Sequence, residues 1–170
     1  ELYDYLDRRV IKRNGPEATL FGTGDDAGKT LAEVAEENQK PFAEVLIEKG
    51  PRGGSAAYFV MNEELQSQLL AAEGVNVCTD GSPTIRHPRG FGSFAKVIRQ
   101  YVNEEGLLTL EEAVYKMSGL PAQTITLDDD QRGMLVEGYK ADVLVFDPES
   151  VQDMATFEDP YQLSAGFETV

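Results

Sequence analysis

The side chains best suited to chemistry in this chain are Asp80 and Arg89, which share one stretch of sequence, VNVCTDGSPTIRHPRGFGSF, from residue 75 to residue 94. Residues 75–79 form an apolar run that predicts a short strand, so Asp80 follows the strand where a loop begins. Barrel enzymes carry their catalytic groups at that end of their strands. Asp80-Gly81 is also a common turn pair, so a capping role for Asp80 stays open at this point.

Arg89 offers a planar, two-pronged donor that matches the geometry of a carboxylate on a substrate. The alternative is a surface ion pair with one of the chain's many acidic residues. His87 could orient the loop or donate to a substrate, or it could serve with Pro88 only to fix a turn, and we do not assign it as a metal ligand. Cys78 lies inside the apolar run, which predicts a small, packed core residue.

The elements that must position these residues alternate between strand and helix. Apolar residues at helical spacing predict a helix over residues 2–13, which Asn14-Gly15-Pro16 ends. Further helices are predicted over residues 30–38, 41–49, 93–105 and 110–118 and after Asn62, with short strands over residues 18–21, 58–61, 75–79 and 142–146. Strand and helix in alternation with short connections are typical of βα units. The polar residues 127–132 predict a boundary, beyond which strand and turn patterns follow.

Several motifs together resemble one enzyme family. In order they are GKTLAEVAEE, AAYFVMNEE, TDG, HPRGFGSF, EEAVYKMSGLPA, the tail RGMLVEGYKADVLVFDP and ATFEDP, which extend from about residue 28 to the end of the chain. This order resembles the carboxy-terminal part of the N-acyl-D-amino-acid deacylases, members of the amidohydrolase superfamily. The resemblance implies an α/β fold in which residues 1–127 supply the last βα units of a (β/α)8 barrel with their following helices. Residues 128–170 would then belong to a small β-sandwich and its tail.

The resemblance also implies a mechanism, zinc-dependent hydrolysis of an N-acyl-D-amino acid. Asp80 matches the family's proton-transferring aspartate at the end of the eighth strand, and Arg89 of the HPR motif matches the arginine associated with the substrate carboxylate. The family's metal ligands come from earlier strands, beginning with a His-x-His pair, whereas this chain has one histidine and one cysteine. A catalytic zinc normally takes three protein ligands, so Asp80 alone could contribute and no complete site is expected here. We therefore expect a fragment, about the last third of an enzyme, that is inactive by itself.

The charge and the cysteine content of the chain indicate which classes of partner to expect. The 30 acidic and 15 basic residues give a formal charge of −15, which would repel nucleic acid and anionic membrane surfaces. The acidity fits either an ordinary solvated surface or a saline habitat. A lone cysteine excludes an internal disulfide, and we expect a cytoplasmic protein. The expected partners are a small N-acyl amino acid and the remainder of the barrel.

Two alternatives to the deacylase function remain. The ADVLVFDP tail occurs widely among amidohydrolases, so a dihydroorotase-like or other cyclic amidase is the nearest alternative. A non-catalytic scaffold that kept this fold is another.

The loop FGTGDDAGKT, from residue 21 to 30, resembles a phosphate-binding loop, but its glycine spacing is wrong for GxxxxGK[ST]. Asp25 and Asp26 would also place negative charge against a phosphate.

Overall fold

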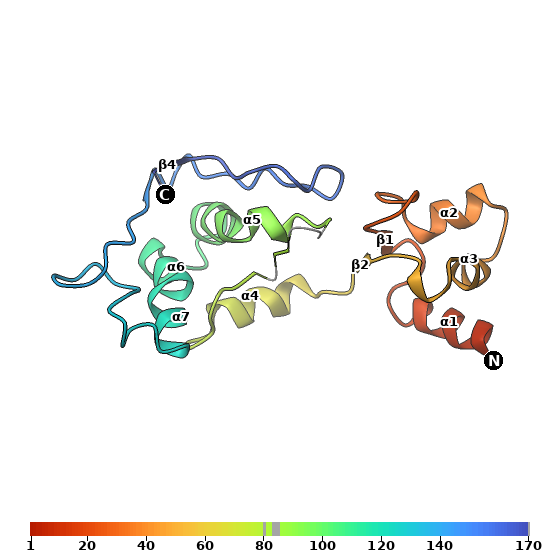
Figure 1. Cartoon of the computed structure of the whole chain (residues 1–170), viewed down its shortest axis with the longest axis horizontal. Coiled ribbons are helices and arrows are strands. Elements are labelled where there is room, and N and C mark those ends of the chain that lie inside the picture. Colours follow the sequence, from red (N-terminus) through yellow and green to blue (C-terminus); the bar gives the residue numbers. More distant parts are fainter. Residues whose placement is uncertain (80, 83–85, 170) are drawn as a thin grey trace. The chain divides into compact units, whose positions relative to one another are not determined.

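A computed structural model describes residues 1–79, 81–82 and 86–169 of the chain. It divides into two compact units (Figure 1). Unit 1 comprises residues 1–61 together with Arg86 and His87, and unit 2 comprises residues 62–79, 81–82 and 88–169. Asp80 lies outside the described residues. No helix in the described part of the chain is both long and apolar enough to cross a membrane.

Unit 1 is a small α+β unit built on a two-stranded sheet. Its elements are α1 (Leu2–Ile11), β1 (Thr19–Phe21), α2 (Leu31–Glu37), α3 (Phe42–Lys49), the 3-10 turn η1 (Gly50–Arg52) and β2 (Ala56–Tyr58). The strands are antiparallel, with Thr19 opposite Tyr58 and Phe21 opposite Ala56. Barrel strands run parallel, so β1 and β2 are not two neighbouring strands of a barrel, and the assignment of residues 1–127 to barrel units stays a prediction. Alternating strand and helix patterns do not encode strand direction, which is why the sequence could not show this.

Local capping signals fix the helix starts of both units. The Thr30 hydroxyl accepts a hydrogen bond from the Glu33 amide at 3.2 Å, and the Glu33 carboxylate accepts one from the Thr30 amide at 2.7 Å. This capping box satisfies two amides that the helix leaves unpaired, and Thr109 with Glu112 repeats it at the start of α6 (Leu110–Met117). Asn62 caps α4 (Glu63–Ala71) by a single bond, since its side-chain oxygen accepts from the Leu65 amide at 2.8 Å. The predicted starts at Thr30 and Asn62 are confirmed.

One hydrophobic cluster closes unit 1. Its buried members come from helix and strand alike: Val10, Phe21, Leu31, Val34 and Val45. Leu31 is fully buried on α2, and Val34 lies one turn further along the same face. Every regular element of the unit except η1 and β2 contributes to this cluster. Unit 1 therefore has a core of its own, assembled from residues 10–45.

Unit 2 is mainly helical. Its elements are α4 (Glu63–Ala71), α5 (Arg89–Lys96), the π-helix η2 (Val97–Glu104), α6 (Leu110–Met117), α7 (Gly119–Thr124), β3 (Val145–Phe146) and β4 (Phe167–Thr169). The last two strands pair antiparallel, and Gln152 and Ala165 bridge the chain segments between them. This carboxy-terminal hairpin runs alongside α5 (Figure 1). The helix α7 was not predicted, because Pro121 suggests a break, yet proline is tolerated in the first turn where its missing amide has no partner.

Two sequence expectations for unit 2 differ from the structure. The predicted strand at residues 75–79 has no regular structure, and the predicted strand at residues 142–146 shortens to Val145–Phe146. On α4, Leu65 and Leu69 are 54% and 53% exposed. A strand forms only where a second backbone pairs with it, and within residues 75–79 the Val77 amide bonds to the Lys116 carbonyl of α6, which is no strand.

The helix formed by α5 and η2 packs on two separate clusters. Val97 and Tyr101 join Leu108 and Ala113 in one cluster, and Val77 packs against it. Ala95 and Ile98 join Val151 in the other. An α-helix repeats every 3.6 residues, and the wider π-turns of η2 change the spacing at which side chains reach the two clusters. One continuous helix thus connects both cores of unit 2.

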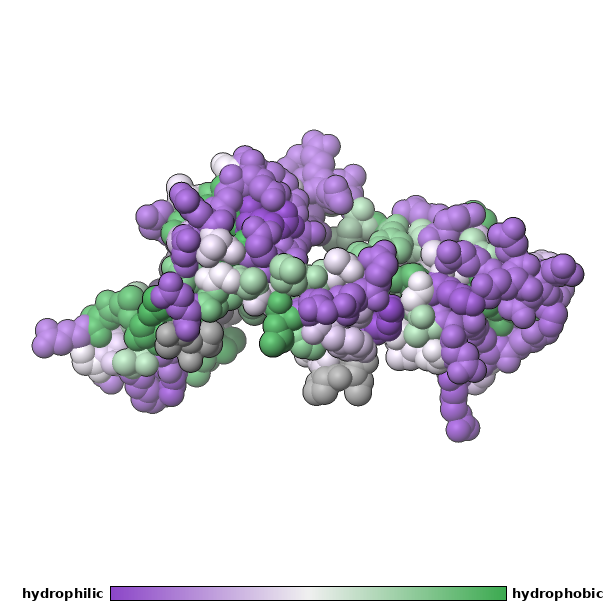
Figure 2. All heavy atoms as spheres, turned by 90° about the horizontal axis from the view of Figure 1, so that it is seen from above, coloured by the Kyte–Doolittle hydropathy of each residue, from purple (hydrophilic) through white to green (hydrophobic). Residues whose placement is uncertain are grey.

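The region between α7 and β3 carries charge pairs and exposed apolar side chains. Asp130 bonds to Lys140, which lowers the pKa of the Asp130 carboxyl, and Arg132 bonds to Asp142. Between and beyond these pairs Leu135, Val136 and Leu144 are 83%, 49% and 45% exposed. Apolar residues reach the molecular surface among predominantly hydrophilic ones (Figure 2). The predicted boundary at residues 127–132 does not coincide with the division into units and stays a prediction.

Candidate functional site

The residues on either side of Asp80 contact the first turn of α5. The Thr79 hydroxyl donates to the Arg89 carbonyl at 2.7 Å and accepts from the Gly81 amide at 3.2 Å. A Cβ atom at Gly81 would lie 3.2 Å from the Gly90 carbonyl oxygen, closer than most side chains tolerate. Glycine at this position therefore permits a close backbone approach. The TDG and HPRG motifs are brought together by these contacts.

Arg89 is the first residue of α5, and its side chain is exposed. Pro88 precedes the helix, and its carbonyl accepts from the amides of Phe91 at 3.1 Å and Gly92 at 2.9 Å. Proline suits a helix start because its fixed φ matches the helical backbone. The amino-terminal end of a helix carries partial positive charge, which adds to the guanidinium charge. The start of α5 is thus electrostatically suited to an anion.

The motif glycines and the carboxy-terminal hairpin hold α5 in place. Gly92 is buried, and a Cβ atom there would lie 3.1 Å from the Cβ atom of Asp153. The Ser164 hydroxyl donates to the Phe91 carbonyl at 2.9 Å, and the Phe91 ring meets Tyr161 edge to face. Arg99 binds the Asp153 carboxylate, an interaction that raises the pKa of the Arg99 guanidinium. These contacts explain why HPRGFGSF and the segment around ATFEDP occur together in the sequence.

A buried lysine holds the chain that leads toward Asp80. Lys116 of α6 is 6% exposed, and its ammonium donates to the carbonyls of Ala72 at 2.6 Å and Val75 at 3.4 Å. Its own carbonyl accepts from the Val77 amide at 3.0 Å. Asn76 donates to the Thr124 hydroxyl at 2.9 Å, while its buried Oδ1 atom accepts no hydrogen bond from the described residues. Sequence reasoning missed Lys116, because a lysine on an amphipathic helix normally faces solvent.

The remaining predicted residues differ from expectation or belong to the other unit. Cys78 is exposed, so its predicted place in a core is wrong, since the apolar run around it has no sheet to cover it. His87 is half-buried and belongs to unit 1, whereas Arg89 belongs to unit 2. The neighbouring Arg86, which sequence reasoning did not select, packs its guanidinium against Gly28, where a Cβ atom would lie 3.0 Å from Nη2.

The loop from residue 21 to 30 is engaged in internal ion pairs. Lys29 donates to both carboxylate oxygens of Glu37, at 2.8 and 2.6 Å, which raises the pKa of the lysine. Asp26 pairs with Lys49, whose ammonium also lies 4.6 Å from the centre of the Phe21 ring. Lys29 and Asp26 of this loop are thus occupied by Glu37 of α2 and Lys49 of α3, which supports the rejection of a phosphate-binding loop.

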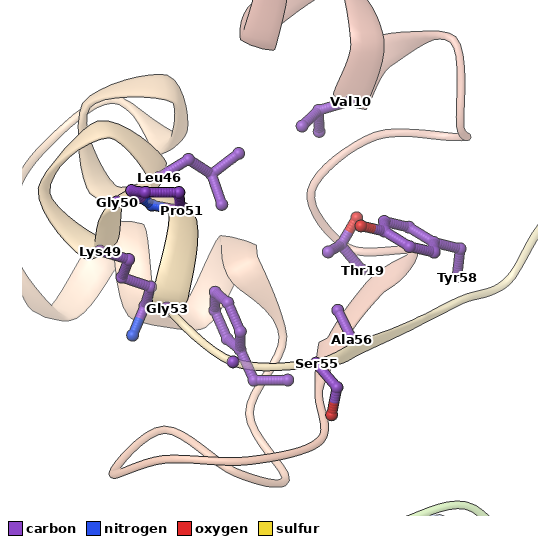
Figure 3. Close-up of a pocket in the computed structure, with 12 residues that line it drawn as sticks. Val10, Thr19, Leu46, Lys49, Gly50, Pro51, Gly53, Ser55, Ala56 and Tyr58 are labelled. Atoms are coloured by element: carbon purple, nitrogen blue, oxygen red, sulfur yellow. The ribbon is translucent and has the colours of Figure 1, made fainter.

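Unit 1 contains a pocket of about 150 Å³ between α1, α3 and the strand pair (Figure 3). Val10 and Leu46 enter it from the helices, and Thr19 and Tyr58 line its strand side. The Thr19 hydroxyl is buried and donates to the Gly15 carbonyl at 3.4 Å. None of the residues predicted for the site lines this pocket.

The described residues do not fit a metal centre. Within residues 1–79, 81–82 and 86–169, no three side chains of His, Cys, Asp or Glu are grouped so that they could hold a metal ion. A catalytic zinc needs about three protein ligands, so the arrangement described here does not supply them. What this part of the chain does supply is a loop anchored to a cationic helix start.

Known proteins share both the sequence and the structure of this chain. A D-aminoacylase and an N-acyl-D-aspartate deacylase, both from Alcaligenes xylosoxydans xylosoxydans, are 42% and 38% identical over 85% and 91% of it. A crystal structure of D-aminoacylase superposes with a TM-score of 0.79 at 39% identity, over 88% of this chain and 32% of that one.

An N-acyl-D-glutamate deacylase from Bordetella bronchiseptica, solved with zinc and a phosphonate inhibitor, superposes with a TM-score of 0.84 at 32% identity, over 93% of this chain and 34% of that one. The chain spans 29% of the length of the curated relatives it matches. The sequence profile described as "Amidohydrolase family" matches residues 15–168. This chain therefore belongs to the amidohydrolase family.

Proposed function

We propose that this chain is part of a zinc-dependent amidohydrolase that hydrolyses N-acyl-D-amino acids to a D-amino acid and a carboxylic acid. One observation carries the proposal: three relatives at 38–42% identity are named as deacylases or aminoacylases of D-amino acids. All three names specify the D configuration, two of them name aspartate and glutamate, and the third names no side chain. The common substrate class is thus an N-acyl-D-amino acid of unspecified side chain.

Asp80 is the proposed proton-transfer group. Hydrolysis of an amide requires that the attacking water lose a proton and that the departing amine gain one, and one carboxylate can do both in turn. The anchoring of Thr79 and Gly81 on the first turn of α5 supports this role, because a general acid-base group must be held at its working position.

Arg89 is the proposed partner of the substrate α-carboxylate. Its guanidinium can bond both carboxylate oxygens at once, and the start of α5 adds the favourable charge of a helix terminus. His87 is proposed to assist at the substrate side of the loop. The deacylase chemistry explains why a fixed cation is needed, since the free α-carboxylate is common to every substrate of this class.

We propose that residues 1–127 belong to the last barrel elements and their helices, with the antiparallel pair of unit 1 outside the barrel sheet, and that residues 128–170 belong to the small β-sandwich. The exposed apolar side chains between α7 and β3 support a covered face in a longer protein. Zinc would be held by ligands outside the described residues and would activate the attacking water. The 170-residue chain by itself is expected to be inactive. Its expected partner is the remainder of the barrel.

The test uses the intact protein that contains this chain, loaded with zinc. It should hydrolyse N-acetyl-D-amino acids, leave the L enantiomers and dihydroorotate almost untouched, and lose on the order of 10²-fold or more in kcat with Asp80→Asn. Hydrolysis of the cyclic amide alone would indicate a cyclic amidase. No turnover of any of these substrates by a folded, metal-loaded protein would indicate a scaffold.

A further inference from the structure

Lys116 is a buried cation whose partners are main-chain carbonyls. Its ammonium reaches Ala72 and Val75 from α6, and among the described residues it forms no ion pair with a carboxylate. A buried ammonium is costly unless it is hydrogen-bonded, so its placement needs a reason. Ala72 supplies one, because it is the C-cap of α4, where the helix dipole places negative partial charge. The Lys116 side chain of α6 therefore caps the carboxyl end of α4.

The same residue fixes the chain beyond α4. Its ammonium holds Val75, its carbonyl holds the Val77 amide, and the Val77 side chain packs against the cluster that includes Ala113 of the same helix. Residues 72–79 have no strand ladder, so these contacts take the place of one. At the far end, Thr79 bonds to the Arg89 carbonyl. The segment is thus fixed by α6 at one end and by α5 at the other.

From this geometry we propose that Lys116 is a positioning residue for the reaction, which fixes the course of the segment that carries Thr79 into Asp80. The inference rests on the proposed function, in which Asp80 transfers the proton. Lys116 touches neither substrate nor reacting atoms in this role. Its effect should fall on kcat, because displacement of an acid-base group by about 1 Å can cost up to about 10²-fold in rate. Substrate affinity depends on Arg89, which α5 and the hairpin hold independently.

The experiment compares Lys116→Met with Lys116→Arg in the intact, zinc-loaded protein. Methionine fills the same space without donors, whereas arginine keeps the charge and donors. Lys116→Met should lower kcat by about 10-fold or more with KM within about twofold of wild type, and Lys116→Arg should recover a large part of kcat. Hydrogen exchange over residues 72–79 should be faster in Lys116→Met than in wild type.

Tyr101→Phe is the matched control. It keeps the buried ring in the cluster against which Val77 packs, removes the hydrogen bond that the Tyr101 hydroxyl accepts from Gln66 of α4, 2.7 Å long, and keeps the donors of Lys116. If Lys116→Met keeps kcat within about twofold of Tyr101→Phe, or loses activity through KM alone, the positioning role is wrong. If Lys116→Met does not fold, Lys116→Gln is measured instead, and failure of both to fold would make Lys116 a folding residue only.

Failure of the proposed function gives a different result. In that case the wild-type protein does not hydrolyse N-acyl-D-amino acids, whereas the exchange measurement on residues 72–79 still reports whether Lys116 holds the segment. Unchanged exchange in Lys116→Met would overturn the proposal without any reference to activity.

Discussion

Unit 1 and the part of unit 2 formed by residues 72–79, 81–82 and 88–92 are held together in different ways. Unit 1 has a strand pair, capped helices and one cluster with Leu31 and Val34 almost fully buried. The described part of the other segment has no regular structure before α5, and side chains bonding to backbone hold it, with Thr79 and Lys116 as the main examples. Helix caps and the burial of apolar side chains stabilise unit 1. The segment with the proposed chemistry depends instead on a few specific polar contacts.

The largest expected effect breaks the core of unit 1. Leu31→Ala should destabilise unit 1 by about 2–5 kcal/mol, because it removes a fully buried side chain and leaves a cavity. Native-state hydrogen exchange should show the loss in α2 and α3. Glu36→Ala, an exposed change on the same helix, is the control and should have almost no effect. Equal loss of protection over residues 72–79 would show that the two regions are not independent.

A second change tests the chemistry of the other region. Arg89→Met in the intact protein should raise KM for N-acyl-D-amino acids by roughly 10²-fold, since it removes a charged hydrogen-bond pair worth about 1.5–3 kcal/mol. The matching substrate amide lacks the carboxylate and is the control. Its turnover should hardly change, and equal losses on both substrates would mean that Arg89 supports the loop only.

A third change tests the close packing of α5 at Gly92 against Asp153. Gly92→Val should cost about 1–3 kcal/mol, because its Cβ atom would crowd Asp153, which is itself bonded to Arg99. Lys96→Val adds the same side chain at an exposed position of the same helix. Denaturant titration of the two variants separates crowding from helix propensity, and equal destabilisation would remove Gly92 from this role.

The repeated capping box allows a matched comparison between the units. Thr30→Ala and Thr109→Ala should each cost about 1 kcal/mol, because each removes the acceptor for one helix amide. Exchange should increase in α2 for the first variant and in α6 for the second. Loss of protection in both helices from either variant would contradict the separation of the units.

The smallest effect is a dependence on pH. Hydrogen bonds from the Thr30 amide and hydroxyl lower the pKa of Glu33 in the folded protein. Glu33 therefore stabilises the fold above the ordinary pKa of a glutamate, and this contribution is lost as the pH falls through the folded pKa. Glu33→Gln should be slightly less stable than wild type at neutral pH and equal to it in acid. A difference that persists in acid would point to packing.

Sequence reasoning succeeded where the cause was local. Thr30 and Asn62 start helices as predicted, because a side-chain cap acts on amides two or three residues away. Pro41 precedes α3 as predicted, because its fixed φ suits a helix start. It failed for residues 75–79 and did not indicate the direction of β1 and β2, because strand pairing depends on segments distant in the sequence. Within the candidate site, the role of Arg89 stays a prediction from its motif, while Lys116 was missed because its burial depends on Ala72 and Val75.

The continuous helix of α5 and η2 is also fixed against rotation about its own axis. Ala95 and Ile98 are embedded in one core and Val97 and Tyr101 in the other, so the helix cannot turn about its own axis without disrupting both. The direction in which Arg89 leaves that axis is therefore set by apolar packing at Ala95 and beyond. A substitution such as Ile98→Ala is expected to change the direction of a cationic side chain nine residues away, and under the proposed function this would change substrate preference from the interior of unit 2.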